Sequence, residues 1–455
     1  MPSRIGFYRI FLIFVVLVLT LAACSSPAAQ PTSNSQPPVA SDTTQPAGVP
    51  AAPAATEPPA AEPTATVPLA QPVPLELADQ GFAVAPNNTV NYAFLVRNPN
   101  PAHAVQNSTF TATFYDAGGA VLGMDDLGAI ELVFPGQTVG VSDALWLDNP
   151  AVASMTIALT SGEPVVMTEA LPPYEVTNSS ICNTALGTAL RAEITSPYAA
   201  NVLLPRVSIL YFDAADKIIG GGYGYRSGFL ANGKTGVLVW GYYAAGMDHF
   251  EVYPGYRGIP SLTTTLPSDA QPLKVTASGY ALNGSTLTYA VIIENPNTTY
   301  TVDQSLLSVN AYAADGTFLT GDPLPVISLL PGQKLGISRE LTLCSDETVD
   351  HIEVAIGSGD FAPPQQTAYF TSENVAFQDG SVSGDLVNQS GLEIKIFYAT
   401  AIVYDANGQI IGGGSQTIDT IAADGRISVQ IPVTVNGTPA RAELYAVLTR
   451  KSLPK

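Results

Sequence analysis

Aromatic residues gather in one part of the chain at a spacing that suits the binding of a flat ligand. The segments "GYGYR", "WGYY" and "YPGYRG" follow one another between residues 221 and 258. In an extended strand both rings of Tyr-Gly-Tyr lie on one face, and tyrosines beside Arg suit sugars or protein partners. The candidate ligand-binding residues are Tyr223, Tyr225, Arg226, Tyr242, Tyr243, Tyr253 and Tyr256. Ordinary packing is the preferred alternative, because strands favour Tyr and Trp, and Trp240 is expected to face the core.

Residues for catalysis or for transition-metal binding form no motif in this sequence. The histidines are His103, His249 and His351, and neither a His-x-x-x-His nor a Cys-x-x-Cys pair is present. No Gly-x-Ser-x-Gly segment offers a nucleophile elbow. The glycine run at Gly220 lies in a strand and turn context and opens no helix, so it is not expected to hold phosphate. We therefore predict no catalytic residue, no cofactor and no enzymatic activity.

Two acidic segments were candidates for calcium, which prefers oxygen ligands. "GMDDLG" contains Asp125 and Asp126, and "CSDETVDH" contains Asp346, Glu347 and Asp350. Neither has the full set of ligand positions of a calcium loop, so solvated acidic loops are preferred and no metal site is predicted.

The chain has a formal net charge of −20 with 18 Lys and Arg, which disfavours nucleic acid as a partner.

The N-terminus has the features of an export signal. Arg4 and Arg9 precede an apolar run that is too short to span a bilayer comfortably, and the run ends in "LAAC". This ending resembles the lipobox of bacterial lipoproteins, which implies cleavage before Cys24 and lipidation of its thiol. The alternative is an ordinary secretory signal with an incidental cysteine. We expect residues 1–24 to be a lipoprotein signal peptide, and the mature protein to be anchored to a membrane at the extracytoplasmic side of the cell envelope.

A tether is expected to follow the signal peptide. Residues 25–72 contain 12 prolines and no aromatic residue. Such a composition cannot bury enough apolar surface to offset the entropy lost on ordering. We predict a disordered linker that holds the rest of the chain away from the membrane.

The remainder of the chain is a fourfold repeat. Each copy has an alternating strand, a loop, and a strand that ends at an aromatic residue before a tight turn rich in Asp, Gly and Asn. The aromatic residues are Tyr115, Phe212, Tyr312 and Tyr404, spaced by 97, 100 and 92 residues. About seven short strands in each hundred residues predict an all-β chain of four tandem immunoglobulin-like β-sandwiches. The predicted domains are 73–167, 168–268, 269–360 and 361–455.

The repeats alternate in type. The first and third share an Asn-Pro-Asn loop at Asn98 and Asn295, whereas the second and fourth share "IIGGG" at Ile218 and Ile410. Proline and asparagine favour turns, so the loop is expected to join strands and not to bind a ligand. The A-B-A-B order indicates a duplicated pair, and the domains are expected to contact one another mostly end to end.

The strand-turn segments "TATFYDAGGAVLG", "SILYFDAADKIIG" and "TAIVYDANGQIIG" resemble the FxLYD immunoglobulin-like domains of bacterial lipoproteins and envelope proteins. The resemblance covers residues from about 76 to 450, and the third repeat departs from it because Ala313 stands where the others have Asp. It implies a fold and an envelope location, and it implies no catalytic residue.

Cys182 and Cys344 lie in different predicted repeats. They form either a disulfide between neighbouring domains or two separate buried thiols, and the sequence favours neither.

The preferred function is a lipid-anchored structural or adhesion-type protein that presents its domains to protein partners at the cell envelope. The alternative is a module that binds carbohydrate or cell wall through the tyrosines of the second repeat.

Overall fold

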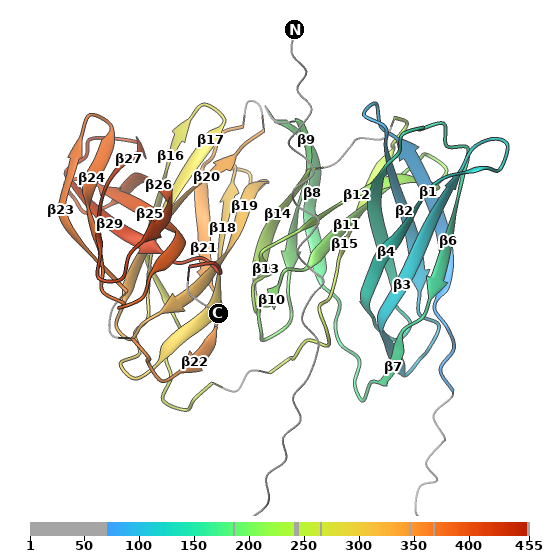
Figure 1. Cartoon of the computed structure of the whole chain (residues 1–455), viewed down its shortest axis with the longest axis horizontal. Helices are drawn as coiled ribbons and strands as arrows, with labels where there is room; N and C mark the ends of the chain where they lie inside the picture. The colour runs from blue at the N-terminus through green and yellow to red at the C-terminus, as the bar shows by residue number, and fades with distance from the viewer. Residues whose placement is uncertain are drawn as a thin grey trace, which may run out of the picture. The chain divides into compact units, whose positions relative to one another are not determined.

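The computed structural model describes residues 71–184, 187–240, 245–263, 266–344, 347–366 and 369–452. Every regular element in these ranges is a β-strand, and the strands form small antiparallel sheets (Figure 1). The predicted all-β class is confirmed. No helix in the described ranges has the length and apolarity that a membrane crossing requires. The predicted signal peptide, Cys24 and the predicted tether up to residue 70 lie outside the described residues.

The four repeats share one strand plan, in which strands one, two and five of a repeat form its first sheet and the others form its second sheet. In the first repeat, the first sheet contains β1 (Glu76–Val84), β2 (Thr89–Arg97) and β5 (Thr138–Trp146), and the second contains β3 (His103–Tyr115), β4 (Val121–Val133), β6 (Ser154–Thr160) and β7 (Glu163–Val166). In the third, they are β16 (Lys274–Asn283), β17 (Thr286–Glu294) and β20 (Lys334–Thr342), and β18 (Thr301–Tyr312), β19 (Phe318–Leu329), β21 (His351–Ile356) and β22 (Asp360–Ala362).

The second and fourth repeats follow the same plan with small changes. The second has β8 (Glu175–Thr184), β9 (Gly187–Thr195) and β14 (Lys234–Trp240) in its first sheet, β11 (Arg206–Phe212), β12 (Ile218–Tyr225) and β15 (His249–Pro254) in its second, and a small third sheet of β10 (Val202–Leu203) and β13 (Gly228–Phe229). The fourth has β23 (Phe370–Gln378), β24 (Ser381–Asn388) and β27 (Arg426–Pro432), and β25 (Ile394–Tyr404), β26 (Ile410–Ile421), β28 (Thr434–Val435) and β29 (Arg441–Val447). Strand β22 pairs with β18, so residues 361–362 belong to the third sandwich.

The repeats pack through the faces of their sheets, and the expectation of end-to-end contact is wrong. The first sheet of each repeat lies on the second sheet of the next: β1 and β2 contact β12, β14 contacts β18 and β19, and β16 and β17 contact β26. A sheet that is covered on both faces must be apolar on both. In β17 this holds: Tyr289 and Val291 face the core of their own sandwich, while Ala290 and Ile292 pack on the fourth repeat, and all four are buried.

The shared "IIGGG" segment is explained by this packing. At Gly221 an added Cβ would lie 2.7 Å from the Cβ of Ser142 and 2.8 Å from that of Ala93, both in the first repeat. At the equivalent Gly413 it would lie 2.7 Å from Oγ of Ser338 in the third repeat. Glycine therefore lets two sheets of neighbouring repeats approach closely.

The turns agree with the sequence prediction. In the Asn-Pro-Asn loop the fully buried Asn98 donates from Nδ2 to the carbonyl oxygens of His103, Val133 and Phe134, at 2.8, 3.0 and 3.0 Å. Asn295 makes two equivalent bonds in the third repeat, to the carbonyl oxygens of Tyr300 and Leu329. These side chains satisfy backbone groups at the strand ends, which supports a joining role for the loop.

Candidate functional site

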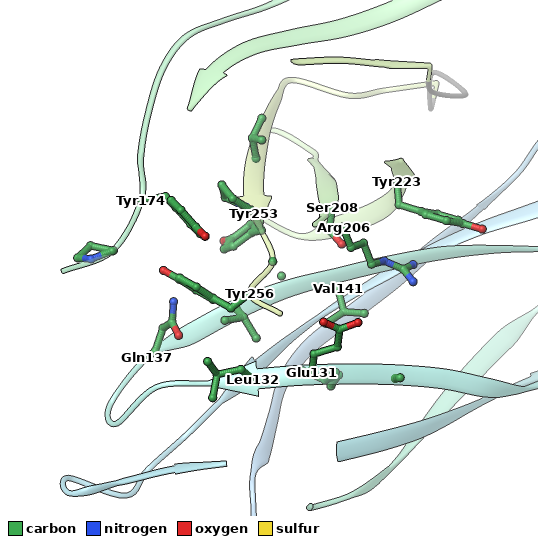
Figure 2. Close-up of a pocket in the computed structure, with 18 of the residues that line it drawn as sticks. Glu131, Leu132, Gln137, Val141, Tyr174, Arg206, Ser208, Tyr223, Tyr253 and Tyr256 are labelled. Atoms are coloured by element: carbon green, nitrogen blue, oxygen red, sulfur yellow. The ribbon is translucent and has the colours of Figure 1, made fainter. Parts of the chain in front are cut away.

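A cavity of about 340 Å³ lies where the first repeat meets the second. The first repeat supplies part of β4 and the N-terminal half of β5, and the second supplies the starts of β8 and β11 and the ends of β12 and β15. Figure 2 shows Tyr174, Tyr256 and Gln137 at one end, Arg206 and Tyr223 at the other, and Glu131 and Leu132 along one side.

Arg206 is the central polar group of the site. Its Nη2 lies 2.8 Å from Oδ2 of Asp143 and also donates to the carbonyl oxygen of Ser142, both in β5 of the first repeat. Its guanidinium lies 4.1 Å from the ring centroid of Tyr223, a cation–π distance. Burial disfavours the charge of Arg206, but Asp143 together with Tyr225 and Tyr223 more than offsets this, so the pKa of Arg206 lies above its ordinary value. The cation is thus held in place by both repeats.

The other end of the cavity is an aromatic cluster. Tyr174 and Tyr256 stack with ring centroids 4.7 Å apart, and Phe134 of the first repeat meets Tyr256 edge-on at 4.7 Å. Burial raises the pKa of Tyr174 and of Tyr253 above the ordinary value, so both phenols stay neutral at physiological pH. The Tyr174 hydroxyl and Nε of Arg206 are buried and have no hydrogen-bond partner among the described residues.

Four of the seven predicted ligand-binding residues line this cavity: Tyr223, Tyr225, Tyr253 and Tyr256. Arg226 does not line it: Tyr225 is the last residue of β12, and the guanidinium of Arg226 interacts electrostatically with Asp322 of the third repeat. Burial lowers the pKa of Arg226 to about 10, and Asp322 only partly offsets this. Tyr242 and Tyr243, like Cys24, lie outside the described residues.

Sequence reasoning missed Arg206, Tyr174 and the residues of the first repeat. Arg206 pairs with Tyr225 across β11 and β12, so its place beside the tyrosines follows from hairpin register. No local signal connects them to Asp143, which is 63 residues away from Arg206. Trp240 was placed wrongly: it ends β14 with 42% of its surface exposed, while the alternating neighbour Val239 faces the core.

The expectation of solvated acidic loops holds for Asp350, which is exposed and lies outside the strands, but it is wrong for Asp125 and Glu347. Asp125 and Asp126 lie within β4, and Asp125 accepts a 2.7 Å hydrogen bond from the buried Tyr92 hydroxyl. Glu347 forms a buried ion pair with Arg191 of the second repeat, whereas Asp346 lies outside the described residues. In the described ranges no three His, Cys, Asp or Glu side chains are grouped as a metal site would need.

The junction of the second and third repeats carries a covalent link. Cys182 and Cys344 form a disulfide, with Cα atoms 5.7 Å apart. This decides between the two alternatives that the sequence left open. Beside it, Arg191 pairs with Glu347 and donates at 3.1 Å to the carbonyl oxygen of Leu319. The bond and the ion pair both cross the junction, so repeats two and three are fastened together.

Comparison with known proteins gives little further information. No protein-family model and no curated protein matches the chain. Among solved structures the chain is similar to Escherichia coli alpha-2-macroglobulin activated by porcine elastase, at 10% identity and a TM-score of 0.13, over 83% of this chain and 44% of that one. The native conformation of the same protein gives 10% identity and a TM-score of 0.12, over 80% of this chain and 27% of that one. The chain thus spans less than half the length of these proteins, and such TM-scores assign no function.

Proposed function

We propose that the chain is a lipid-anchored extracytoplasmic structural protein without enzymatic activity, which presents immunoglobulin-like sandwiches to other proteins at the cell envelope. The observation that carries this proposal is the sheet-on-sheet packing at all three junctions. Independent domains on flexible linkers would move separately. Four sandwiches stacked through buried faces keep their exposed surfaces in fixed positions, which suits a protein that holds partners in a set arrangement.

The disulfide supports an extracytoplasmic location. Disulfides persist in oxidising compartments and are rare where thiols are kept reduced. The Cys182–Cys344 bond joins two repeats, so it would contribute to the stability of the stack only outside the cytoplasm. The "LAAC" segment and the resemblance to FxLYD domains of envelope proteins support the same location.

The anchor is tested by replacing Cys24. In the Cys24→Ser variant we expect the protein to move from the membrane fraction to the soluble extracytoplasmic fraction, because the acceptor of the lipid is gone. Ser25→Ala is the matched control and should remain in the membrane fraction. Equal membrane retention of both variants would contradict the anchor.

The contact role is tested by site-specific photo-crosslinking in the native cell. Val121 and Met124 on β4 are 57% and 54% exposed, and large exposed apolar side chains are common at contact sites. A photoreactive residue at these positions should give discrete crosslinked species of higher mass. The same residue at the exposed polar Gln416 on β26 is the control and should give none. Absence of crosslinks at Val121 and Met124 would count against this surface.

A second candidate function is carbohydrate or cell-wall binding through the second repeat. The specific observation in its favour is that four predicted tyrosines line a single cavity together with Arg206. A packing role alone does not require them to meet at a cavity. Retention of the protein on isolated cell-wall material would support this function.

A further inference from the structure

We propose that the cavity between the first two repeats is a binding site for a small neutral saccharide, formed jointly by both repeats. This inference rests on the second candidate function and adds the place of the site and the class of ligand. The cavity of about 340 Å³ has the size of a small-molecule site.

The charges around the cavity favour an uncharged ligand. Arg206 is neutralised by Asp143 at 2.8 Å, and Glu131 is neutralised by Arg257 at 3.3 Å. A phosphate or carboxylate ligand is normally met by a cation that lacks its own counter-ion, and a cation is met by unpaired carboxylates. These two ion pairs leave no net charge, so the site does not select for either kind of ion.

The hydrogen-bonding groups favour a hydroxylated ligand. Tyr174 is 8% exposed, yet its hydroxyl has no partner among the described residues, and the same is true of Nε of Arg206. Both side chains line the cavity, and in Figure 2 the Tyr174 hydroxyl points towards the other lining side chains. Buried polar groups are nearly always bonded. A sugar hydroxyl both donates and accepts, so it satisfies a phenol and a guanidinium equally well.

The rings provide the apolar contact that a sugar needs. Tyr225 is 59% exposed and meets Tyr223 edge-on with centroids 6.2 Å apart. Tyr223 is held by the guanidinium of Arg206, and Val141 lies between the two ends of the cavity (Figure 2). Aromatic faces beside satisfied charges fit the apolar faces of a pyranose ring better than they fit an extended peptide, whose backbone needs a strand edge to pair with.

The test uses the full-length chain in detergent and isothermal titration with defined probes. The neutral probes are cellobiose, maltose, mannobiose and chitobiose at millimolar concentration, and the comparison probes are glucuronate and triglycine. Ala129→Trp places an indole at an exposed lining position of β4. Ala158→Trp is the matched control at an exposed position of β6 in the same sheet, away from the cavity. Equal thermal unfolding of both variants establishes that the fold is retained.

The proposal expects at least one neutral disaccharide to bind, with the affinity lost in Ala129→Trp and kept in Ala158→Trp. Tyr174→Phe, which removes a hydroxyl without a protein partner, should weaken binding by about threefold to tenfold and leave the melting temperature unchanged. Binding of glucuronate or triglycine alone, or of no probe, overturns the proposal. If isolated cell wall retains Ala129→Trp as strongly as the wild type, carbohydrate binding stands but this cavity is not its site. If isolated cell wall retains neither protein, the carbohydrate-binding function and this site both fail.

Discussion

The partners of the Arg191–Glu347 ion pair should depend on each other for stability more than those of the exposed Glu373–Arg426 pair. Their side chains are 8% and 16% exposed, and the pair crosses the junction of repeats two and three. Replacing Glu347 by Ala leaves the Arg191 cation buried without its carboxylate. Breaking a buried pair in this way costs about 3–5 kcal/mol. Arg191 keeps the Ser180 hydroxyl and the Leu319 carbonyl as acceptors, so we expect the lower value, about 3 kcal/mol.

The matched control is Glu373→Ala in the fourth repeat. Glu373 pairs with Arg426, and these side chains are 47% and 50% exposed. Exposed pairs contribute about 0–1 kcal/mol because water and salt screen them. In urea unfolding followed by far-ultraviolet circular dichroism, a slope of about 3 kcal/mol/M gives a midpoint shift of about 1 M for Glu347→Ala. The control should shift by about 0.3 M or less.

A double replacement separates the ion pair from its surroundings. Apolar residues of similar size often restore the stability that is lost when one buried partner is removed. We therefore expect Arg191→Met combined with Glu347→Leu to be more stable than Glu347→Ala alone. If Glu347→Ala and Glu373→Ala shift the urea midpoint equally, the reasoning that the junction is a desolvated interface is refuted.

Three further predictions concern the stack. Cys182→Ser with Cys344→Ser should lower the free energy of unfolding by about 2–5 kcal/mol, and reduction of the wild type should reproduce the loss; equal urea midpoints with and without reductant would contradict it. Gly413→Ala should cost about 1–3 kcal/mol by overpacking the junction, since its Cβ would lie 2.7 Å from Oγ of Ser338 in the third repeat, while Gly118→Ala in an exposed turn should be nearly neutral in the same assay. Arg226→Met should raise stability by up to about 3 kcal/mol at pH 7, because burial lowers the pKa of Arg226 to about 10; this gain should shrink as pH rises through 10 towards the unfolded value, and a destabilised variant would refute it.

The sequence was sufficient to predict the unit of this fold but not how the units meet. The alternation in β17 and the hairpin turns depend on neighbours in the chain, and both are confirmed. Even the departure at Ala313 is accommodated locally, since Asp315 accepts the amide of Thr317 at 2.9 Å in the same turn. Contacts within about ten residues are fixed by local geometry, which explains these successes.

Only half of the candidate site could be predicted, because the other half depends on contacts between residues far apart in the sequence. Tyr223 and Tyr225 share a face because they are two residues apart in β12, and that much follows from strand geometry. Asp143 and Tyr174 join them only because the sheets of two repeats stack, and no pattern in either segment reports that contact. The apolar character of both faces of β17 is visible in the sequence, but the expectation of end-to-end contact left the second face without a neighbouring sheet to cover it.

The outer sheet of the fourth repeat differs in polarity from the inner sheets of the stack. The inner faces present Ala93, Gly221 and Ile292, whose side chains have no polar atom that needs a partner. The outer face of β24 and β27 presents Asp385 and Arg426 instead, joined by an exposed ion pair. Terminal units of repeat arrays need such polar faces for solubility. A further sandwich stacked on this face in the same manner would have to desolvate both charges.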